Sequence, residues 1–286
     1  MRPWYRDPAK VGVLALLLVA AAFFLLPLYV MTITSLKGMP EIREGNLFAW
    51  PRHAGFAAWR AAWQSACTGV DCSGLRGGFW NSVQIVVPST AIAVALGALN
   101  GYALAFWRPR GANLLFGVLL IGAFLPVQVM MFPLVRGLAP LHLVGSLPGI
   151  VLVHVIFAMP VMTLLFRNYY AALPQELFHA ARCDGAGFLR IFWQLMLPLS
   201  LPMLAVAAIM QATGVWNDYL LGLVFAGREH LPMTVQLNNL VNTTTGTRAY
   251  DVDMAATLLA SLLPLLVYAF AGRWFVRGIA SGALKG

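Results

Sequence analysis

The sequence is poor in charged residues and in cysteine. Asp, Glu, Lys and Arg make up only 10% of its 286 residues, whereas they make up about 25% of a typical soluble domain. Apolar residues account for 60%, and the mean hydropathy is +0.77. The three cysteines and five histidines form no set with the spacing of metal ligands. This composition excludes an ordinary soluble domain and predicts a membrane protein for which we expect no metal site.

Motifs for catalysis and for ion coupling are also missing. No GxxxxGK[ST] loop is present, because the stretch from Gly278 to Lys285 lacks both the spacing and the hydroxyl residue. The apolar segments contain almost no ionisable side chains, although proton-coupled carriers usually keep such groups at membrane depth. No cluster of a nucleophile, a base or metal ligands is found that could face one membrane surface. These absences argue against a membrane enzyme and an ion-coupled carrier. If the protein drives uphill transport, the energy must therefore come from another subunit.

Six apolar segments are long enough to cross a hydrocarbon core of about 30 Å. They lie near Val11–Ser35, Phe79–Phe106, Ala112–Val135, Leu147–Phe166, Leu197–Leu223 and Val252–Arg273. Interior prolines such as Pro88 and Pro126 are compatible with helices here, because neighbouring spans can satisfy the freed carbonyls. We therefore expect one all-α transmembrane domain over residues 1–286. Its outer loop lies at about 36–78, a cytoplasmic loop at about 168–196 and a cytoplasmic tail at about 274–286.

The basic residues indicate which side of the membrane the loops occupy. The net charge is +9, but these charges are scattered between apolar runs and form no compact patch of the kind that binds nucleic acid. With both termini inside, the cytoplasmic pieces hold eleven of the nineteen Lys and Arg residues. The sequence therefore predicts a multi-pass protein of the cytoplasmic (inner) membrane with both termini in the cytoplasm. Trp107 lies near the predicted inner edge, where an interfacial anchor suffices to explain it.

The cysteines separate by location. Cys67 and Cys72 lie in the predicted outer loop, where an oxidising compartment permits a disulfide. Pairing and two unpaired thiols both remain open for them. Cys183 lies in the cytoplasmic loop, where we expect a free thiol.

The cytoplasmic loop contains a short polar stretch, Pro174–Gly185, between two long apolar segments. Pro174 suits the first position of a helix, because its missing N–H leaves no donor unused there. Ala180 and Ala181 allow another surface to approach the backbone closely, and Gly185 can adopt the positive φ that ends a helix. A polar helix with small residues, held between two spans, is predicted to dock on a partner.

This stretch, with Leu197 and Pro198 after it, resembles the "EAA" coupling loop in the membrane subunits of ABC importers. The likeness extends over nearly the whole chain to the second, shorter permease of the maltose-type group. Several runs are closest to permeases of glucose/mannose-type importers: Ala66–Cys72, Phe79–Val83, Leu99–Ala103, Phe166–Tyr170, Val215–Tyr219, Val241–Gly246 and the tail Gly272–Gly286. The resemblance implies six transmembrane helices of the ABC importer permease type.

In that family the short helix sits in a groove on a cytoplasmic ATPase. By resemblance, the residues that contact the ATPase here are Glu176, His179, Ala180, Ala181, Arg182, Asp184 and Gly185. His179 stands where the family normally has Glu, and Glu176 on the same helical face is a candidate replacement. The alternative for the charged members is a solvated helix face. The tail residues Arg277, Gly282, Lys285 and Gly286 are expected near the ATPase dimer, with a frayed terminus as the alternative.

The resemblance also implies partners and a substrate. The partners are a sister permease in a heterodimer, two copies of an ATPase that bind ATP and Mg²⁺, and an extracytoplasmic sugar-binding protein. No cofactor is expected on this chain. Candidates for the substrate path are Asn100, Gln128, Gln211, Trp216, Asn217, Asp218 and Tyr219, for which interhelical packing or interfacial anchoring is the alternative. The prediction is a permease subunit that imports a small sugar of the glucose/mannose type by alternating access. The rivals are an ion-coupled carrier and a non-transporting assembly factor.

Overall fold

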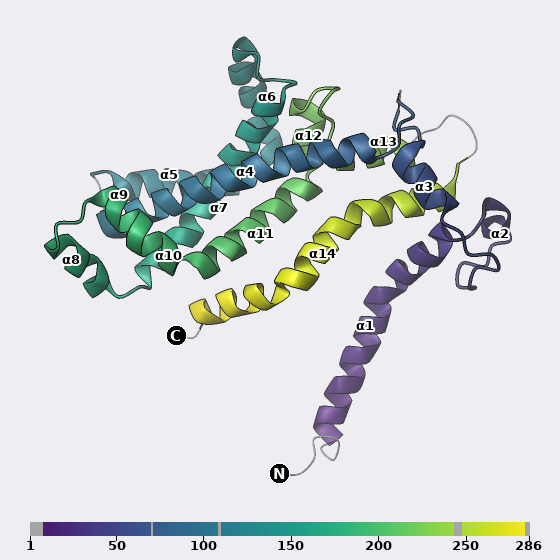
Figure 1. Cartoon of the computed structure of the whole chain (residues 1–286), viewed down its shortest axis with the longest axis horizontal. Helices are drawn as coiled ribbons and strands as arrows, with labels where there is room; N and C mark the ends of the chain where they lie inside the picture. The colour runs from purple at the N-terminus through teal and green to yellow at the C-terminus, as the bar shows by residue number, and fades with distance from the viewer. Residues whose placement is uncertain (1–7, 70, 108–109, 243–247, 284–286) are drawn as a thin grey trace. The chain divides into compact units, whose positions relative to one another are not determined.

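The computed structural model describes residues 8–69, 71–107, 110–242 and 248–283, with side chains described as far as Phe270. Over these residues the secondary structure is helical (Figure 1). The first half contains α1 (Pro8–Ser35), α2 (Met39–Arg43), α3 (Ala57–Gln64), α4 (Arg76–Tyr102), the π-helix η2 (Ala103–Trp107), α5 (Ala112–Phe124), α6 (Val127–Leu138) and the 3₁₀-helix η3 (Ala139–Leu141). The second half contains α7 (Leu147–Ala171), α8 (Gln175–Cys183), α9 (Phe188–Ile191), the π-helix η4 (Phe192–Met196), α10 (Leu197–Leu199), α11 (Leu201–Asn217), α12 (Leu220–Phe225), α13 (Met233–Val241) and α14 (Tyr250–Ala283).

The prediction of an all-α membrane protein is confirmed. Among the described residues, four helices are long and apolar enough to cross a membrane: α1, α4 with η2, α7, and α14 over Tyr250–Phe270. Two further pairs meet the same criterion only together. The segment α5 is bent by 110° from Val127–Leu141, and Phe188–Leu199 is bent by 79° from α11. Counting each bent pair as one span gives up to six.

Two of the predicted spans are interrupted. The third, Ala112–Val135, breaks at Leu125 and Pro126, whose ψ angles are 129° and 132°. The ring of a proline disfavours the α conformation of the residue before it, so Leu125 is extended. The expectation that Pro126 lies within a helix is therefore wrong. The fifth predicted span, Leu197–Leu223, is also divided, because Asp218 is extended (ψ 131°) between α11 and α12.

The contacts divide the chain into two compact units, which are described separately. Unit 1 comprises Met1–Arg76 and Leu237–Leu262. The most apolar 18-residue window of α1 has no buried residue, as suits a helix that faces lipid. The indole Nε1 of Trp59 in α3 donates a hydrogen bond to Ser35 Oγ at the end of α1, over 3.1 Å. At the start of α14, Arg248 forms an ion pair with the buried Asp253 over 3.0 Å, and this bond raises the pKa of Arg248.

Unit 2 comprises Gly77–Gln236 and Leu263–Gly286. Helix α7 contacts α5, α11, α12 and η2, so it is the central helix of this unit. A Cβ atom at Gly97 of α4 would lie 2.5 Å from Met162 Cβ, and one at Gly101 would lie 2.6 Å from the backbone N of Arg167. These two glycines, four residues apart, let α4 and α7 approach closely, as small residues do between membrane helices.

The start of α4 is fixed to the segment that leads into α13. The amide of Asn81 donates hydrogen bonds to the carbonyl oxygens of Glu229 and Leu231, each over 3.1 Å. The hydroxyl of Ser82 accepts the backbone N–H of Met233 over 2.8 Å and is buried. The polar residues of the run Phe79–Val83 therefore have a structural role, which is to satisfy backbone groups of a neighbouring loop.

Candidate functional site

The short polar helix predicted over Pro174–Gly185 is present as α8. Pro174 (φ −58°, ψ 125°) precedes the helix, which begins at Gln175, so its predicted place at the first helical position is wrong by one residue. At the other end Gly185 has a φ of +77°, as expected. The N–H of Gly185 donates to the Arg182 carbonyl and that of Ala186 to the Ala181 carbonyl, each over 3.0 Å. This pair of bonds is a Schellman motif, which satisfies carbonyls that a helix end leaves free.

One side chain of α8 is buried and attaches the helix to the rest of unit 2. The ring of Phe178 is 5% exposed. It stacks on Phe106 of η2, with ring centroids 4.8 Å apart and planes inclined by 25°. It also meets the edge of Trp107, with centroids 5.8 Å apart. An aromatic pair of this kind adds a preferred geometry to the burial of apolar area.

The remaining candidate residues of α8 leave a mostly exposed polar face. Ala181 is half-buried against the core, whereas the exposed members are Glu176, His179, Ala180, Arg182, Asp184 and Gly185. Glu176 and His179 are three residues apart and therefore share a face. Glu176 lies in the first turn, where a carboxylate interacts favourably with the helix dipole. The helix thus offers a carboxylate, an imidazole and a small alanine to a partner surface.

The π-helix η2 contacts α8, and a hydrogen-bond chain runs from η2 to the start of α9. Tyr102, which precedes η2, is completely buried. The indole Nε1 of Trp107 donates to Tyr102 Oη over 2.6 Å, and Tyr102 Oη donates to the Phe188 carbonyl over 3.2 Å. The sequence suggests only an interfacial anchor for Trp107 and no role for Tyr102. The sequence signal was the density of aromatic residues from Tyr102 to Trp107. The structure adds that this segment is a π-helix, which often occurs at functional sites.

Two of the seven predicted path residues line the same cavity. Gln211 and Asp218 border a cavity of about 260 Å³, and His154 of α7 borders it as well. His154 is 6% exposed, and its Nε2 lies 3.9 Å from Asp218 Oδ2. The sequence reasoning missed His154. The signal for it was a single imidazole within the otherwise apolar run of α7.

Asp218 also has a structural task at the break between α11 and α12. Its carboxylate accepts the backbone N–H groups of Leu221 and Gly222, over 3.4 and 2.9 Å. The hydroxyl of Thr234 donates to the backbone carbonyl of Asp218 over 2.6 Å. Asp218 therefore caps the N-terminal end of α12, as Asp commonly does.

The other five candidates do not line this cavity. Trp216 is 3% exposed and packs edge-on against Phe79, with centroids 5.6 Å apart. The side-chain amide of Asn100 lies 4.0 Å from the sulfur of Met159. Packing between helices therefore describes both residues. The exposed members of the set are Gln128, Asn217 and Tyr219.

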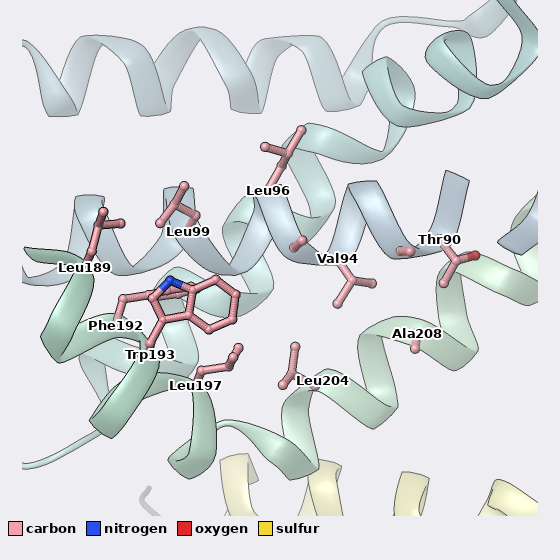
Figure 2. A pocket seen from close by; sticks show the side chains of 12 residues that line it. Thr90, Val94, Leu96, Leu99, Leu189, Phe192, Trp193, Leu197, Leu204 and Ala208 are labelled. Carbon is pink, nitrogen blue, oxygen red and sulfur yellow. The ribbon is translucent and has the colours of Figure 1, made fainter. Parts of the chain in front are cut away.

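A larger cavity of about 480 Å³ is lined by residues of α4, α9, η4, α10 and α11. In the close-up of Figure 2 the rings of Phe192 and Trp193 lie at one end and Thr90 lies at the other, with aliphatic side chains between them. Thr90 and Trp193 supply the only polar side-chain atoms of this lining. A sugar placed there would lose most of its hydrogen bonds to water without replacement, which is costly. The smaller cavity at Gln211 is therefore the better candidate for a sugar.

The remaining predicted residues are the three cysteines and the tail. Cys67 and Cys72 are joined by a disulfide in the structure, and Cys183 is an exposed free thiol on α8. The backbone of α14 continues through Arg277 and Gly282 to Ala283, so the predicted tail begins as part of this helix. The side chains beyond Phe270, and Lys285 and Gly286 altogether, lie outside the described part of the chain.

Comparison with known proteins gives a consistent result. The family described as "Binding-protein-dependent transport system inner membrane component" matches residues 80–281. The osmoprotective compounds uptake permease protein GgtD of Synechocystis sp. is 39% identical over 217 residues, which are 74% of this chain and 72% of GgtD. The glucose import system permease protein GlcU of Saccharolobus solfataricus is 29% identical and covers 98% of this chain and 95% of its own length.

A solved structure shares the fold. It belongs to a bacterial ABC transporter involved in the import of the acidic polysaccharide alginate. One of its chains superposes with a TM-score of 0.81 at 21% identity, over 96% of this chain and 99% of the alginate transporter chain.

Proposed function

This chain belongs to the family of binding-protein-dependent transport system inner membrane components, and from that membership we propose how it moves its substrate and which substrate it moves. It is a multi-pass membrane protein and a permease subunit of an ABC importer for sugars. The proposal concerns three finer points, which are the sugar, the partners and the residues that serve each of them.

The proposed substrate is a small sugar of the glucose or mannose type. Support comes from the local runs in the sequence that resemble such permeases and from the full-length likeness to the glucose permease GlcU. The printed names of the relatives also include osmoprotective compounds, so the choice of sugar must be measured. The proposed site of passage is the cavity bordered by Gln211, Asp218 and His154, because it brings hydrogen-bonding groups together at the break between α11 and α12. A sugar is oriented in a pocket by hydrogen bonds from its hydroxyl groups to a few polar side chains that point to the same place.

The proposed partners are a sister permease, two copies of a cytoplasmic ATPase that bind ATP and Mg²⁺, and an external sugar-binding protein. The observation that carries this proposal is α8, whose exposed polar face is attached to the spans by the buried Phe178. A helix fixed on one side and free on the other can receive force from a docked subunit and pass it to the membrane helices. ATP hydrolysis on the partner would thereby drive alternating access of the substrate path.

One observation favours an ion-coupled carrier instead. His154 and Asp218 are ionisable groups within or beside predicted spans, 3.9 Å apart, and such groups are typical of proton relays. However, the carboxylate of Asp218 is engaged as a helix cap, which accounts for its presence without a relay.

The test is purification of the complex through a tag on this chain, followed by reconstitution in vesicles. We expect a second permease and an ATPase to co-purify, and we expect binding protein plus glucose or mannose to stimulate both ATP hydrolysis and sugar uptake. Gln211→Leu should raise the sugar concentration needed for half-maximal uptake. Gln128→Leu serves as the matched control, because Gln128 is an exposed residue of α6 that does not line this cavity. Uptake driven by a proton gradient without ATP would establish the carrier instead. A complex that transports nothing with any sugar would establish an assembly factor.

A further inference from the structure

Arg182 differs from the other charged residues of α8 in what its charge contacts. Its guanidinium carbon lies 4.7 Å from the centroid of the Trp107 ring, in the geometry of a cation–π interaction. Phe178, four residues earlier and therefore on the same face of α8, contacts Trp107 and Phe106. Helix α8 thus contacts the end of the α4–η2 segment at two points that are one helical turn apart.

From Trp107 the contacts continue into the buried core of unit 2. Trp107 Nε1 donates to Tyr102 Oη, which donates to the Phe188 carbonyl at the start of α9. The Tyr102 ring packs against Phe188 and Phe192, with centroids 4.8 and 5.6 Å apart. Tyr102 is buried, whereas Trp107 and Phe188 are half-buried. Loss of either hydrogen bond would therefore weaken the satisfaction of the buried Tyr102 hydroxyl, which favours one arrangement of the three residues.

These contacts connect α8 to a helix that is not its neighbour in sequence. Helix α8 follows α7 after a short connection and precedes α9, so both neighbours in sequence receive its movement through the backbone. Helix α4 has no such backbone connection to α8. The aromatic and hydrogen-bonded contacts at Phe106, Trp107 and Tyr102 therefore provide a direct side-chain link from α8 to α4.

We propose that Trp107 and Tyr102 are positioning residues that transmit the movement of α8 to α4, and that Arg182 serves this link instead of the partner surface. This inference rests on the proposed docking of α8 on an ATPase. It assigns the exposed Glu176 and His179 to the partner, whereas Phe178 and Arg182 act inside the permease.

The first experiment needs no partner. In the purified chain, the melting temperatures of Arg182→Gln, Trp107→Leu and the double variant form a double-mutant cycle. We expect Arg182→Gln to lower the melting temperature of the wild-type chain but to add little in the Trp107→Leu background, because the cation–π contact is already absent there. Trp107→Leu should have an effect in either background, because it also removes the contacts of Trp107 with Tyr102 and Phe178. Additive shifts would overturn the link between Arg182 and Trp107.

The second experiment uses the full reconstituted complex and measures ATP hydrolysed per sugar imported. Tyr102→Phe keeps the ring and removes the hydroxyl, and Trp107→Phe keeps an aromatic ring and removes the N–H. We expect the ATPase to co-purify at the wild-type level with each variant, while the ATP used per sugar rises about fivefold, as for the loss of one hydrogen bond. The matched control is Tyr170→Phe, which removes a buried hydroxyl bonded to Ser200 in the same core without touching α8. Its ratio should stay at the wild-type value.

The outcomes separate this inference from the function on which it rests. A wild-type ratio in Tyr102→Phe overturns the inference and leaves the importer intact. Salt-dependent loss of the ATPase in Arg182→Gln, with none in Trp107→Leu, makes Arg182 a partner contact and also overturns it. A wild-type complex without sugar-dependent ATP hydrolysis overturns the proposed function itself.

Discussion

Unit 2 holds two irregular segments by different physical means. At α8 the chain is held by a buried aromatic ring, Phe178, and the helix ends use backbone conformation without a capping side chain. At the junction of α11 and α12 the chain is held by one carboxylate, Asp218, which accepts two backbone N–H groups. The first arrangement depends on ring shape and tolerates changes of charge on the exposed face. The second depends on an acceptor atom and tolerates little change of chemistry.

The largest expected effect is at the buried ring of α8. Phe178→Ala removes the stacked contact with Phe106 and leaves a cavity, which for a buried Phe costs about 3–5 kcal/mol of stability. We expect a lower melting temperature of the purified complex and loss of the co-purifying ATPase. Leu177→Ala is the control, because Leu177 is adjacent and 41% exposed. Equal melting temperatures for the two variants would show that the ring does not hold α8.

The next effect is at the end of α8. Gly185→Val places a β-branched residue at a φ of +77°, which costs about 1–3 kcal/mol. A Cβ atom at Gly185 would have no atom within 4 Å, so the cost arises from backbone conformation and not from a clash. Gly185→Asn is the control, because Asn tolerates the left-handed conformation. We expect Val to impair sugar-stimulated ATP hydrolysis while Asn preserves it, and equal activity of the two variants would exclude a requirement for this conformation.

These two predictions concern the part of the site that the sequence describes best. The boundaries of α8 are local, since Pro174 and Gly185 restrict their own backbone and the polar composition excludes the segment from a span. The break at Pro126 is different, because a proline can lie inside a membrane helix when its surroundings satisfy the freed carbonyl. Pro88 and Pro160 do lie inside helices, so only tertiary structure distinguishes them from Pro126.

Contacts between residues far apart in sequence are the other feature that the sequence could not supply. The approach of His154 to Asp218 depends on how α7 packs against α11 and α12, and the position of Arg182 over Trp107 depends on where α8 meets η2. The glycines that set the packing of α4 on α7 do have a sequence signal. Gly97 and Gly101 form a GxxxG pattern within an apolar run, which is typical of close helix contacts in membranes.

A smaller effect is expected at the α11–α12 junction, and two substitutions separate its two properties. Asp218→Ala removes the cap of α12, at a cost of about 0.5–2 kcal/mol. Asp218→Asn keeps a capping oxygen and removes the charge beside His154. We expect the Ala variant to melt at a lower temperature and the Asn variant to melt near wild type. If the carboxylate also contacts the sugar, the Asn variant will need more sugar for half-maximal uptake, and unchanged uptake would limit Asp218 to the structural role.

The smallest effect is at the exposed face of α8, where the resemblance to the "EAA" coupling loop places His179 at the position that normally holds Glu. An exposed ion pair contributes about 0–1 kcal/mol, so His179→Glu should change assembly only slightly. If the ATPase groove keeps an arginine for that Glu, the variant will bind the ATPase more tightly and its binding will weaken as salt is added, because salt screens exposed charges. If the groove has adapted to His179, the added carboxylate will be unmatched and sugar-stimulated hydrolysis will fall. Glu176→Ala, measured alongside, shows whether the neighbouring carboxylate already supplies the charge. Hydrolysis and salt dependence unchanged in both variants would leave Ala180, Ala181 and the turn at Gly185, through shape alone, to form the contact with the ATPase.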